Sequence, residues 1–182
     1  MKKITDMAHE LLSSYVHKTA ICADFTMGNG YDTRFFAERA TAGTVYAFDI
    51  QEEALTQTKK LLNDTANVRL ILDNHLSMDR YIQDKLDAAI FNFGYLPNGS
   101  TTITTDAEIS LSAVKKAFRL CKKHALLILV CYPGHAQGTK EAAMITKWCE
   151  SLDAYTARIM KITMMNKPHA PFLFAVEKLS DL

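Results

Sequence analysis

The chain has 182 residues, of which 48% are hydrophobic and 23% charged, and its formal net charge is +1 at pH 7. These proportions are those of an ordinary soluble globular protein, and residues 1–182 are sufficient for one domain with a sizeable core. The near-neutral charge neither indicates nor excludes a nucleic-acid partner, since a local patch of charge can bind one.

No apolar run approaches the ~20 residues of a membrane span. The charged start of the chain lacks the apolar region of a secretory signal. The four cysteines stand far apart in the sequence, as in proteins that keep their thiols reduced. We therefore expect a cytoplasmic protein with no membrane contact.

Strand-like apolar runs alternate with helix-like segments along the chain. Hydrophobic spacing predicts helices over 6–16, from 31 onward, and over 52–62, 78–83, 106–122 and 139–152. Apolar runs bounded by turn residues predict strands over 20–23, 44–49, 68–72, 87–91, 125–131, 157–165 and 172–177. Asp106 and Thr139 are the expected N-caps of the last two helices, and the threonine-rich residues 98–105 are expected to form a loop.

The connection between the last two strands is too short for a parallel crossover. Residues 166–171 join them, whereas a crossover takes about a dozen residues or more. The last strand should therefore run antiparallel to its neighbour. A Rossmann-like α/β fold with seven strands, mostly parallel with an antiparallel last strand and helices on both faces, is the layout of class I methyltransferases. This layout favours S-adenosyl-L-methionine as the cofactor.

A turn with two glycines follows the first strand. Residues 24–33 read Asp-Phe-Thr-Met-Gly-Asn-Gly-Tyr-Asp-Thr, and a helix is predicted to begin there. A strand, a glycine turn and a helix bring the backbone close to a nucleotide in α/β proteins. Asp49 closes the second strand, where a carboxylate is placed to accept both ribose hydroxyls. We interpret these two pieces as one adenosine site that includes Gly28, Asn29, Gly30 and Asp49.

The turn fits S-adenosylmethionine better than a dinucleotide. The dinucleotide motif G-x-G-x-x-G/A needs a third small residue where this chain has Thr33. Asp32 falls where the start of the helix would receive a pyrophosphate, and its charge would repel that anion. S-adenosylmethionine carries no phosphate, and its sulfonium and ammonium groups are positive. Asp24 and Asp32, on either side of the turn, therefore suit this cofactor.

Further polar residues follow the second and third strands, at the edge where ligands of doubly wound sheets bind. Gln51 is expected close to the adenine edge, and Asn74 or His75 on the other side of the adenine. A metal site at His75, His135 and His169 is the competing interpretation. These histidines lie on separate loops without short ligand spacing, so we expect no metal.

The residues after the fourth strand, Asn92-Phe93-Gly94-Tyr95, resemble the (Asp/Asn)-Pro-Pro-Tyr loop of methyltransferases that act on amino nitrogens. In that loop a side-chain oxygen and a backbone carbonyl accept the N–H bonds of the amine and aim its lone pair at the methyl carbon. The amine has to arrive uncharged, so a base within reach would help. We expect Asn92 to hold the amine and Tyr95 to stack on the target base. His135 or Tyr132 would hold or deprotonate the amine.

One predicted helix carries a row of basic residues. They recur at helical spacing and are Lys115, Lys116, Arg119, Lys122 and Lys123. This basic stripe is either a surface for RNA or a solvated helix face.

Several segments, taken together, resemble one bacterial family. They are residues 24–33, Tyr-Ala-Phe-Asp-Ile-Gln at 46–51, Ala-Ile-Phe-Asn-Phe-Gly-Tyr-Leu-Pro at 89–97, Thr-Ile-Thr-Thr at 102–105, Tyr-Pro-Gly-His at 132–135 and Ala-Pro-Phe-Leu-Phe-Ala-Val-Glu-Lys at 170–178. The family is labelled as rRNA methylases, and its members include a tRNA 5-(aminomethyl)-2-thiouridine methyltransferase. The resemblance implies methyl transfer to the primary amine on the wobble uridine of the tRNA anticodon. It also implies that Asn29, Asp49, Gln51 and His75 contact the cofactor.

The family has Tyr-His-Gly-His where this chain has Tyr-Pro-Gly-His, which shifts a catalytic role at this motif to His135. Methylation of ribosomal RNA or of a small amine is the alternative enzyme function. A nucleotide-binding sensor module without catalysis is the alternative from another class. The sequence leaves the oligomeric state open, and a homodimer is one alternative.

Overall fold

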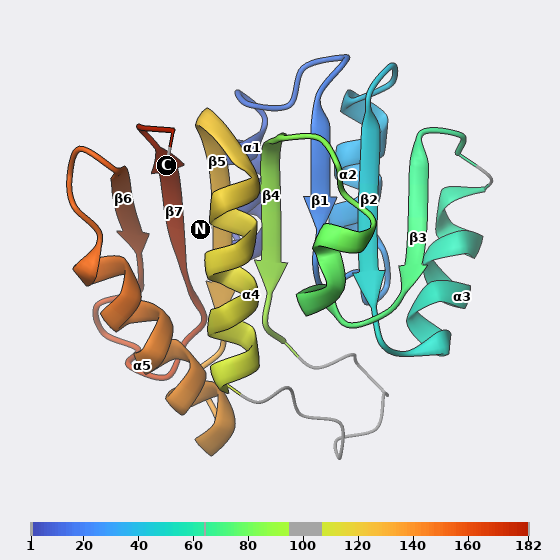
Figure 1. Ribbon diagram of the computed structural model, residues 1–182. Coiled ribbons are helices and arrows are strands. Elements are labelled where there is room, and N and C mark those ends of the chain that lie inside the picture. The colour runs from blue at the N-terminus through green and yellow to red at the C-terminus, as the bar shows by residue number, and fades with distance from the viewer. Residues whose placement is uncertain (1, 64, 95–106, 182) are drawn as a thin grey trace.

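The computed structural model describes residues 2–63, 65–94 and 107–181, which contain one sheet with helices on both faces (Figure 1). The strands are β1 (Ile21–Asp24), β2 (Thr44–Asp49), β3 (Val68–Leu72), β4 (Leu86–Asn92), β5 (Cys121–Cys131), β6 (Ala157–Ile162) and β7 (Phe172–Lys178). The helices are α1 (Ile4–Leu12), α2 (Tyr31–Arg39), α3 (Glu52–Leu62), the 3₁₀ helix η1 (His75–Arg80), α4 (Ala107–Leu120) and α5 (Ala136–Ser151).

The seven strands lie in the order β3-β2-β1-β4-β5-β7-β6. β1 pairs in parallel with both β2 and β4, so that Cys22 lies opposite Val45 and Ala88. β7 pairs antiparallel with β5 and β6, and Ala175 lies opposite Ile128 and Met160. The predicted sheet, mostly parallel with a reversed last strand, is therefore confirmed.

Two clusters of buried apolar side chains cover the two faces of the sheet. On one face Phe118 of α4 belongs to the same cluster as Phe91 of β4. On the other face Phe36 of α2 belongs to the same cluster as Ile90. Ile90 and Phe91 are neighbours in one strand, and successive side chains of a strand point to opposite faces. In Figure 1, α4 and α5 lie in front of the sheet, and α1 and α2 lie behind it.

The predicted bounds of 44–49, 52–62 and 68–72 agree with the structure, whereas several others were wrong. α1 ends at Leu12 rather than at residue 16, and β6 ends at Ile162 rather than at residue 165. β5 begins at Cys121, within the residues predicted as helix. Its first residues are polar and its register with β4 shifts early in the strand, so the apolar pattern begins only later.

The last helix is capped by a histidine and not by the predicted Thr139. The N-cap of α5 is His135, whose Nδ1 accepts the backbone N–H of Gly138 at 3.0 Å. The short helix predicted over 78–83 is the 3₁₀ helix η1, which begins three residues earlier at His75. Asp106 and the loop predicted over 98–105 lie outside the described residues.

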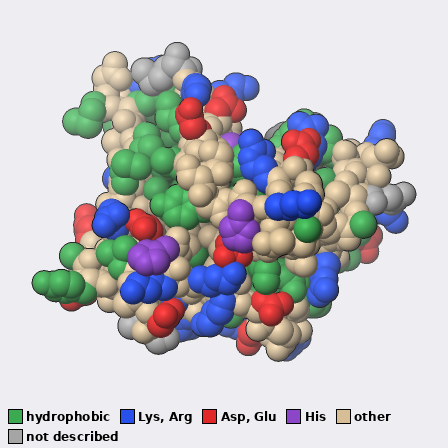
Figure 2. Space-filling view, turned by 90° about the horizontal axis from the view of Figure 1, so that it is seen from above, with side chains coloured by type: hydrophobic (Ala, Val, Ile, Leu, Met, Phe, Trp, Pro, Cys, Tyr) green, Lys and Arg blue, Asp and Glu red, His purple; other side chains and the backbone are tan. Residues whose placement is uncertain are grey.

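The predicted basic stripe does not lie on one helix, because α4 ends at Leu120 and Lys122 and Lys123 belong to β5. Part of the stripe is engaged in ion pairs. Lys116 pairs with Asp79 at 2.8 Å and also donates to the carbonyl oxygen of Leu76. Lys122 pairs with Asp87 at 2.6 Å, near the amino ends of the parallel strands. Figure 2 views this end of the molecule, where Lys and Arg side chains are interspersed with Asp and Glu. These contacts favour the solvated-face interpretation of the stripe.

A buried lysine of β7 forms hydrogen bonds with the backbone at the end of α4. The side chain of Lys178 is 1% exposed, and its Nζ donates to the carbonyl oxygens of Cys121 at 2.8 Å and Arg119 at 3.4 Å. The carbonyls at a helix C-terminus carry partial negative charge, which stabilises a nearby cation. No helix in the described part of the chain combines the length and apolar character needed to cross a membrane.

Candidate active site

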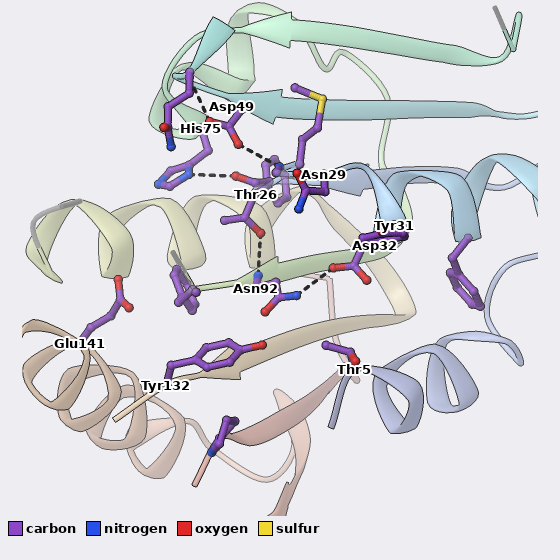
Figure 3. A pocket seen from close by; sticks show the side chains of 18 of the residues that line it. Thr5, Thr26, Asn29, Tyr31, Asp32, Asp49, His75, Asn92, Tyr132 and Glu141 are labelled. Atoms are coloured by element: carbon purple, nitrogen blue, oxygen red, sulfur yellow. Dashed lines mark hydrogen bonds between the residues drawn. The ribbon is translucent and has the colours of Figure 1, made fainter. Parts of the chain in front are cut away.

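A cavity of about 1070 Å³ lies at the carboxyl ends of the parallel strands (Figure 3). Most of the predicted site residues line it, namely Gly28, Asn29, Asp32, Asp49, Gln51, Asn74, His75, Asn92 and His135. Gly30 lies beneath the turn against α3, and Tyr95 falls outside the described residues. The fold thus brings together segments that are far apart in the sequence, as expected for a doubly wound sheet.

The glycine turn between β1 and α2 needs glycine at two positions. Gly28 has φ of 50° and Gly30 has φ of 80°, both in the left-handed region. A Cβ at Gly30 would lie 2.7 Å from Oγ1 of Thr58 on α3. The same Thr58 hydroxyl donates to the carbonyl oxygen of Gly28 at 3.1 Å. α3 therefore supports the turn from the side away from the cavity.

Asp49 ends β2 and contacts the glycine turn. Its Oδ2 accepts the backbone N–H of Gly28 at 2.9 Å, and its Oδ1 accepts the backbone N–H of Gln51 at 3.0 Å. Each carboxylate oxygen has a further lone pair. The two oxygens can therefore accept a pair of neighbouring hydroxyls, such as those of a ribose.

His75 presents an acceptor nitrogen, whereas Asn74 uses its side-chain oxygen locally. Nδ1 of His75 lies 3.1 Å from the carbonyl oxygen of Phe25, which makes Nδ1 the protonated nitrogen. Its Nε2 is buried and has no hydrogen-bond partner among the described residues. Burial lowers the pKa of His75 and keeps the ring neutral. Oδ1 of Asn74 caps η1 by accepting the N–H of Leu76 at 2.8 Å.

Asp24 is fully buried and organises the turn. Its carboxylate accepts the Thr33 hydroxyl at 2.6 Å and the backbone N–H of Thr26 at 3.1 Å. Burial, followed by the negative charge of Asp32, raises the pKa of Asp24. Thr33 therefore has a function that a third small residue would lack, which accounts for the departure from the dinucleotide motif.

Asp32 connects α1 to the end of β4. Its Oδ1 lies 2.5 Å from Nε2 of His9, and its Oδ2 accepts Nδ2 of Asn92 at 3.1 Å. The ring of His9 stacks on Phe35, with 4.2 Å between the centroids. Asp32 is buried, and Figure 3 shows its side chain and that of Asn92 pointing toward each other. Asp32 thus fixes the orientation of the Asn92 amide.

The carbonyl oxygen of the Asn92 side chain is left without a partner. The backbone N–H of Asn92 donates to Oγ1 of Thr26 at 2.7 Å, and Nδ2 donates to Asp32. Oδ1 is buried with no hydrogen bond to any described residue. A buried acceptor without a donor is costly, so this oxygen is suited to a donor that a ligand brings. The hydroxyl of Tyr132 points toward the Asn92 side chain in Figure 3.

Tyr132 and His135 can each donate a hydrogen bond to a ligand. Burial raises the pKa of Tyr132, the charge of Asp32 adds to the rise, and an interaction with the Asn92 side chain opposes it, so the hydroxyl stays protonated at neutral pH. Nδ1 of His135 accepts the N–H of Gly138, which places the proton of the neutral ring on Nε2.

Several residues that line the cavity were missed from the sequence, among them His9, Thr26 and Glu141. Thr26 belongs to the glycine-turn motif, so the motif itself contained the signal. His9 and Glu141 lie on helices, and their sequence neighbours give no sign of a site. His75, His135 and His169 do line the same cavity. Within residues 2–63, 65–94 and 107–181, however, no group of three His, Cys, Asp or Glu side chains is placed to hold a metal.

The sheet order with its reversed β7, the glycine turn and the carboxylate that ends β2 define a Rossmann-like methyltransferase dependent on S-adenosylmethionine. The cavity fits this cofactor because Asp32 stands in the first turn of α2, where a pyrophosphate would require the opposite charge.

The chain belongs to the family described as "Putative rRNA methylase", which matches residues 45–177. It is 32% identical over 186 residues to the chloroplastic tRNA (mnm(5)s(2)U34)-methyltransferase of Arabidopsis thaliana, covering 94% of this chain and 68% of that protein. A "putative rRNA-methylase" of Clostridium thermocellum superposes with a TM-score of 0.93 at 32% identity, covering 98% of this chain and 99% of that one. A "putative methyltransferase" of Streptococcus mutans in complex with SAH gives 0.89 at 35% identity, with the same coverage. These matches disfavour the non-catalytic sensor module.

Proposed function

We propose that this methyltransferase transfers a methyl group to the primary amine of 5-aminomethyl-2-thiouridine at the wobble position of tRNA, giving 5-methylaminomethyl-2-thiouridine. The observation that carries the proposal is the buried Oδ1 of Asn92, which accepts no hydrogen bond from a described residue and is held in place through Asp32. An amine brings the N–H donor that this oxygen lacks. The name of the Arabidopsis relative supports the tRNA substrate.

The residues that would hold the cofactor surround the glycine turn and the ends of β2 and β3. They are Gly28, Asn29, Gly30, Asp32, Asp49, Gln51, Asn74 and His75. Asp49 would accept the ribose hydroxyls, and Nε2 of His75 would accept a hydrogen bond from the adenine. S-adenosylmethionine, when bound, supplies an electrophilic methyl group on a positively charged sulfur.

Catalysis would depend mainly on positioning. Displacement at a sulfonium needs the amine lone pair in line with the methyl group, and correct orientation alone can contribute several orders of magnitude in rate. Asn92 would orient the amine through Oδ1, and the hydroxyl of Tyr132 would donate to a neighbouring acceptor. His135 would act as a donor through Nε2, and Tyr95 would stack on the uracil.

Methylation of ribosomal RNA is the second candidate, because the family description names it. The same cofactor residues would serve either substrate, and also a small amine.

We propose the cytoplasm as the site of the reaction. A homodimer is an alternative to a monomer, and sedimentation of the purified protein would decide between them.

The decisive experiment incubates the protein with S-adenosylmethionine and tRNA that carries the unmethylated aminomethyl wobble uridine. Nucleoside mass spectrometry should show that this nucleoside gains a single methyl group. Unmodified tRNA of the same isoacceptor serves as the control and should gain none. Methylation of ribosomal RNA but not of the tRNA would overturn the proposal.

A further inference from the structure

Glu141 is a buried acid in the wall of the cavity. It lies on α5, is 7% exposed, and lines the same cavity as Asn92 and Tyr132. Figure 3 shows its carboxylate extending from α5 on the same side of the site as Tyr132. The Ser110 hydroxyl of α4 donates to Oε1 of Glu141 at 2.5 Å. Glu141 takes part in none of the ion pairs formed by the described residues.

A buried carboxyl without a cation is poised to exchange a proton. Burial raises the pKa of Glu141 to about 7, and the hydrogen bond from Ser110 limits the rise. Cys131 at the end of β5 interacts electrostatically with Glu141. Tyr132, His135 and His169 line the same cavity, and Lys140 precedes Glu141 on α5. Two cations that line the cavity belong to other elements, since Lys3 is the N-cap of α1 and Arg34 lies on α2.

We propose that Glu141 takes up the proton that the substrate amine must lose before it is methylated, an inference that rests on the proposed function. A primary alkylamine is an ammonium ion at neutral pH, because its pKa is about 10, as for lysine. An ammonium ion has no lone pair with which to attack. One proton passes from the ammonium nitrogen to a carboxylate oxygen of Glu141, leaving a neutral amine and a neutral carboxylic acid.

The proton balance closes over one turnover. Methylation of the neutral amine gives a secondary ammonium that keeps the two remaining protons of the nitrogen. The proton on Glu141 is released to solvent when the product leaves. The enzyme therefore returns to its starting state and releases one proton for each methyl group transferred.

The polar groups that lie next to Asn92 in the site are less suited to accept this proton. Asp32 is already engaged by His9 and by Nδ2 of Asn92. Tyr132 is held in its protonated form, and the Nδ1 lone pair of His135 is engaged by Gly138. The amide of Asn92 is not basic. Burial disfavours charged forms, so it raises the pKa of an acid and lowers that of an amine. A water-poor site thus favours the neutral pair of acid and amine over the pair of ions.

The experiment measures kcat as a function of pH for the wild type, Glu141→Gln and Ser110→Ala, with the aminomethyl tRNA as substrate. Glutamine keeps the size of the side chain and the acceptor for Ser110 but cannot take up a proton. At pH 7, Glu141→Gln should lower kcat by about 100-fold or more, the usual range for loss of a general base. This loss should shrink as the pH rises to 9, because solvent then deprotonates the amine.

Ser110→Ala is the matched variant, because it keeps the Glu141 carboxyl and changes only its pKa. It removes the hydrogen bond that lowers the pKa of Glu141, so the acidic limb of the kcat profile should move to higher pH while its plateau is kept. S-adenosylhomocysteine should bind all three proteins within about twofold, which verifies that they are folded.

Two results would overturn the inference. In one, Glu141→Gln shows the same pH profile as the wild type. In the other, it loses the same factor at every pH, as expected for a purely structural residue. In both cases the wild type still methylates the wobble nucleoside, and the proposed function stands. Failure of the wild type to methylate it would overturn the proposed function and the inference together.

Discussion

Nε2 of His9 lies 2.5 Å from Oδ1 of Asp32, so a helix that precedes the sheet contacts the carboxylate that orients Asn92. The contact is braced by the stacking of His9 on Phe35. The first helix of the chain is therefore part of the active-site wall, although it contributes no residue to the glycine turn.

Asp32→Asn should lower turnover more than it lowers cofactor affinity. The side-chain amide that replaces the Asp32 carboxylate can turn its NH₂ group toward Nδ2 of Asn92. The Asn92 amide then loses the acceptor that fixes its orientation. Loss of such an orienting partner typically costs about 10-fold to 100-fold in activity. We expect kcat to fall within this range while the Kd for S-adenosylhomocysteine, measured by calorimetry, rises less than fivefold, because this ligand lacks the positive sulfur that Asp32 would face in the cofactor. A rise in Kd that accounts for the whole effect would assign Asp32 to the cofactor alone.

Asn92→Ala should spare cofactor binding and lower kcat by about 100-fold or more, because it removes the acceptor that positions the amine. Its backbone N–H can still donate to Thr26, so the end of β4 should keep its place. Single-turnover assays with labelled S-adenosylmethionine would measure the effect. Turnover equal to that of the wild type would remove Asn92 from the mechanism.

Asp49→Ala should abolish cofactor binding. Two hydrogen bonds from ribose hydroxyls to a carboxylate are each worth about 1.5–3 kcal/mol, so affinity for S-adenosylhomocysteine should fall by about 100-fold or more. Glu53→Ala removes the same charge from an exposed position at the start of α3 and should bind normally. Isothermal titration of both variants tests the assignment, and unchanged affinity in Asp49→Ala would refute it.

Gly30→Ala should destabilise the protein. The residue has φ of 80°, and an added Cβ would lie 2.7 Å from Oγ1 of Thr58, so we expect a loss of about 1–3 kcal/mol in the free energy of unfolding. Adding Thr58→Ala removes the two nearest atoms, Oγ1 and Cγ2, but keeps Cβ at 3.0 Å and the backbone strain, and it loses the hydrogen bond to Gly28. It should therefore restore at most part of the loss. Urea denaturation provides the measurement. A denaturation midpoint equal to the wild type would contradict the described turn.

The stability of the wild type relative to Glu141→Gln should fall as the pH rises. Folding raises the pKa of Glu141 from 4.5 to about 7, so between these values the unfolded chain is ionised while the folded one keeps its proton. Each pH unit in this window costs the wild type about 1.4 kcal/mol. Between pH 5 and pH 8 the difference in unfolding free energy should change by about 2–3 kcal/mol. A difference that does not vary with pH would show that Glu141 is not buried in this way.

The sequence was most informative where one local pattern determined the structure. The second and third strands and the helix between them lie within their predicted bounds, because each apolar run ends at clear turn residues. The reversal of β7 followed from the length of a single connection. Gly28, Asp49 and Asn92 were placed correctly in one cavity because parallel strands end at the same edge of a sheet.

Other features depend on contacts between segments that are distant in sequence. The contact between His9 and Asp32 needs α1 to pack next to α2, and the burial of Glu141 needs α4 to lie against α5. The use of His135 as an N-cap rather than as an open loop residue depends on where α5 begins. Hydrophobic periodicity carries no information about any of these relationships.

The position of β7 between β5 and β6 has a consequence for synthesis of the protein. Residues 172–178 leave the ribosome after all the other strands of the sheet, so until then β5 has an unpaired edge and β6 has no neighbour. The glycine turn, Asp49 and Asn92 belong to strands that are made much earlier. The part of the cavity proposed for the cofactor can therefore assemble first, whereas the wall that contains His169 and Pro171 waits for the last strand. An open strand edge invites pairing with other chains, so the nascent protein is most exposed to misassembly just before it becomes able to enclose a substrate.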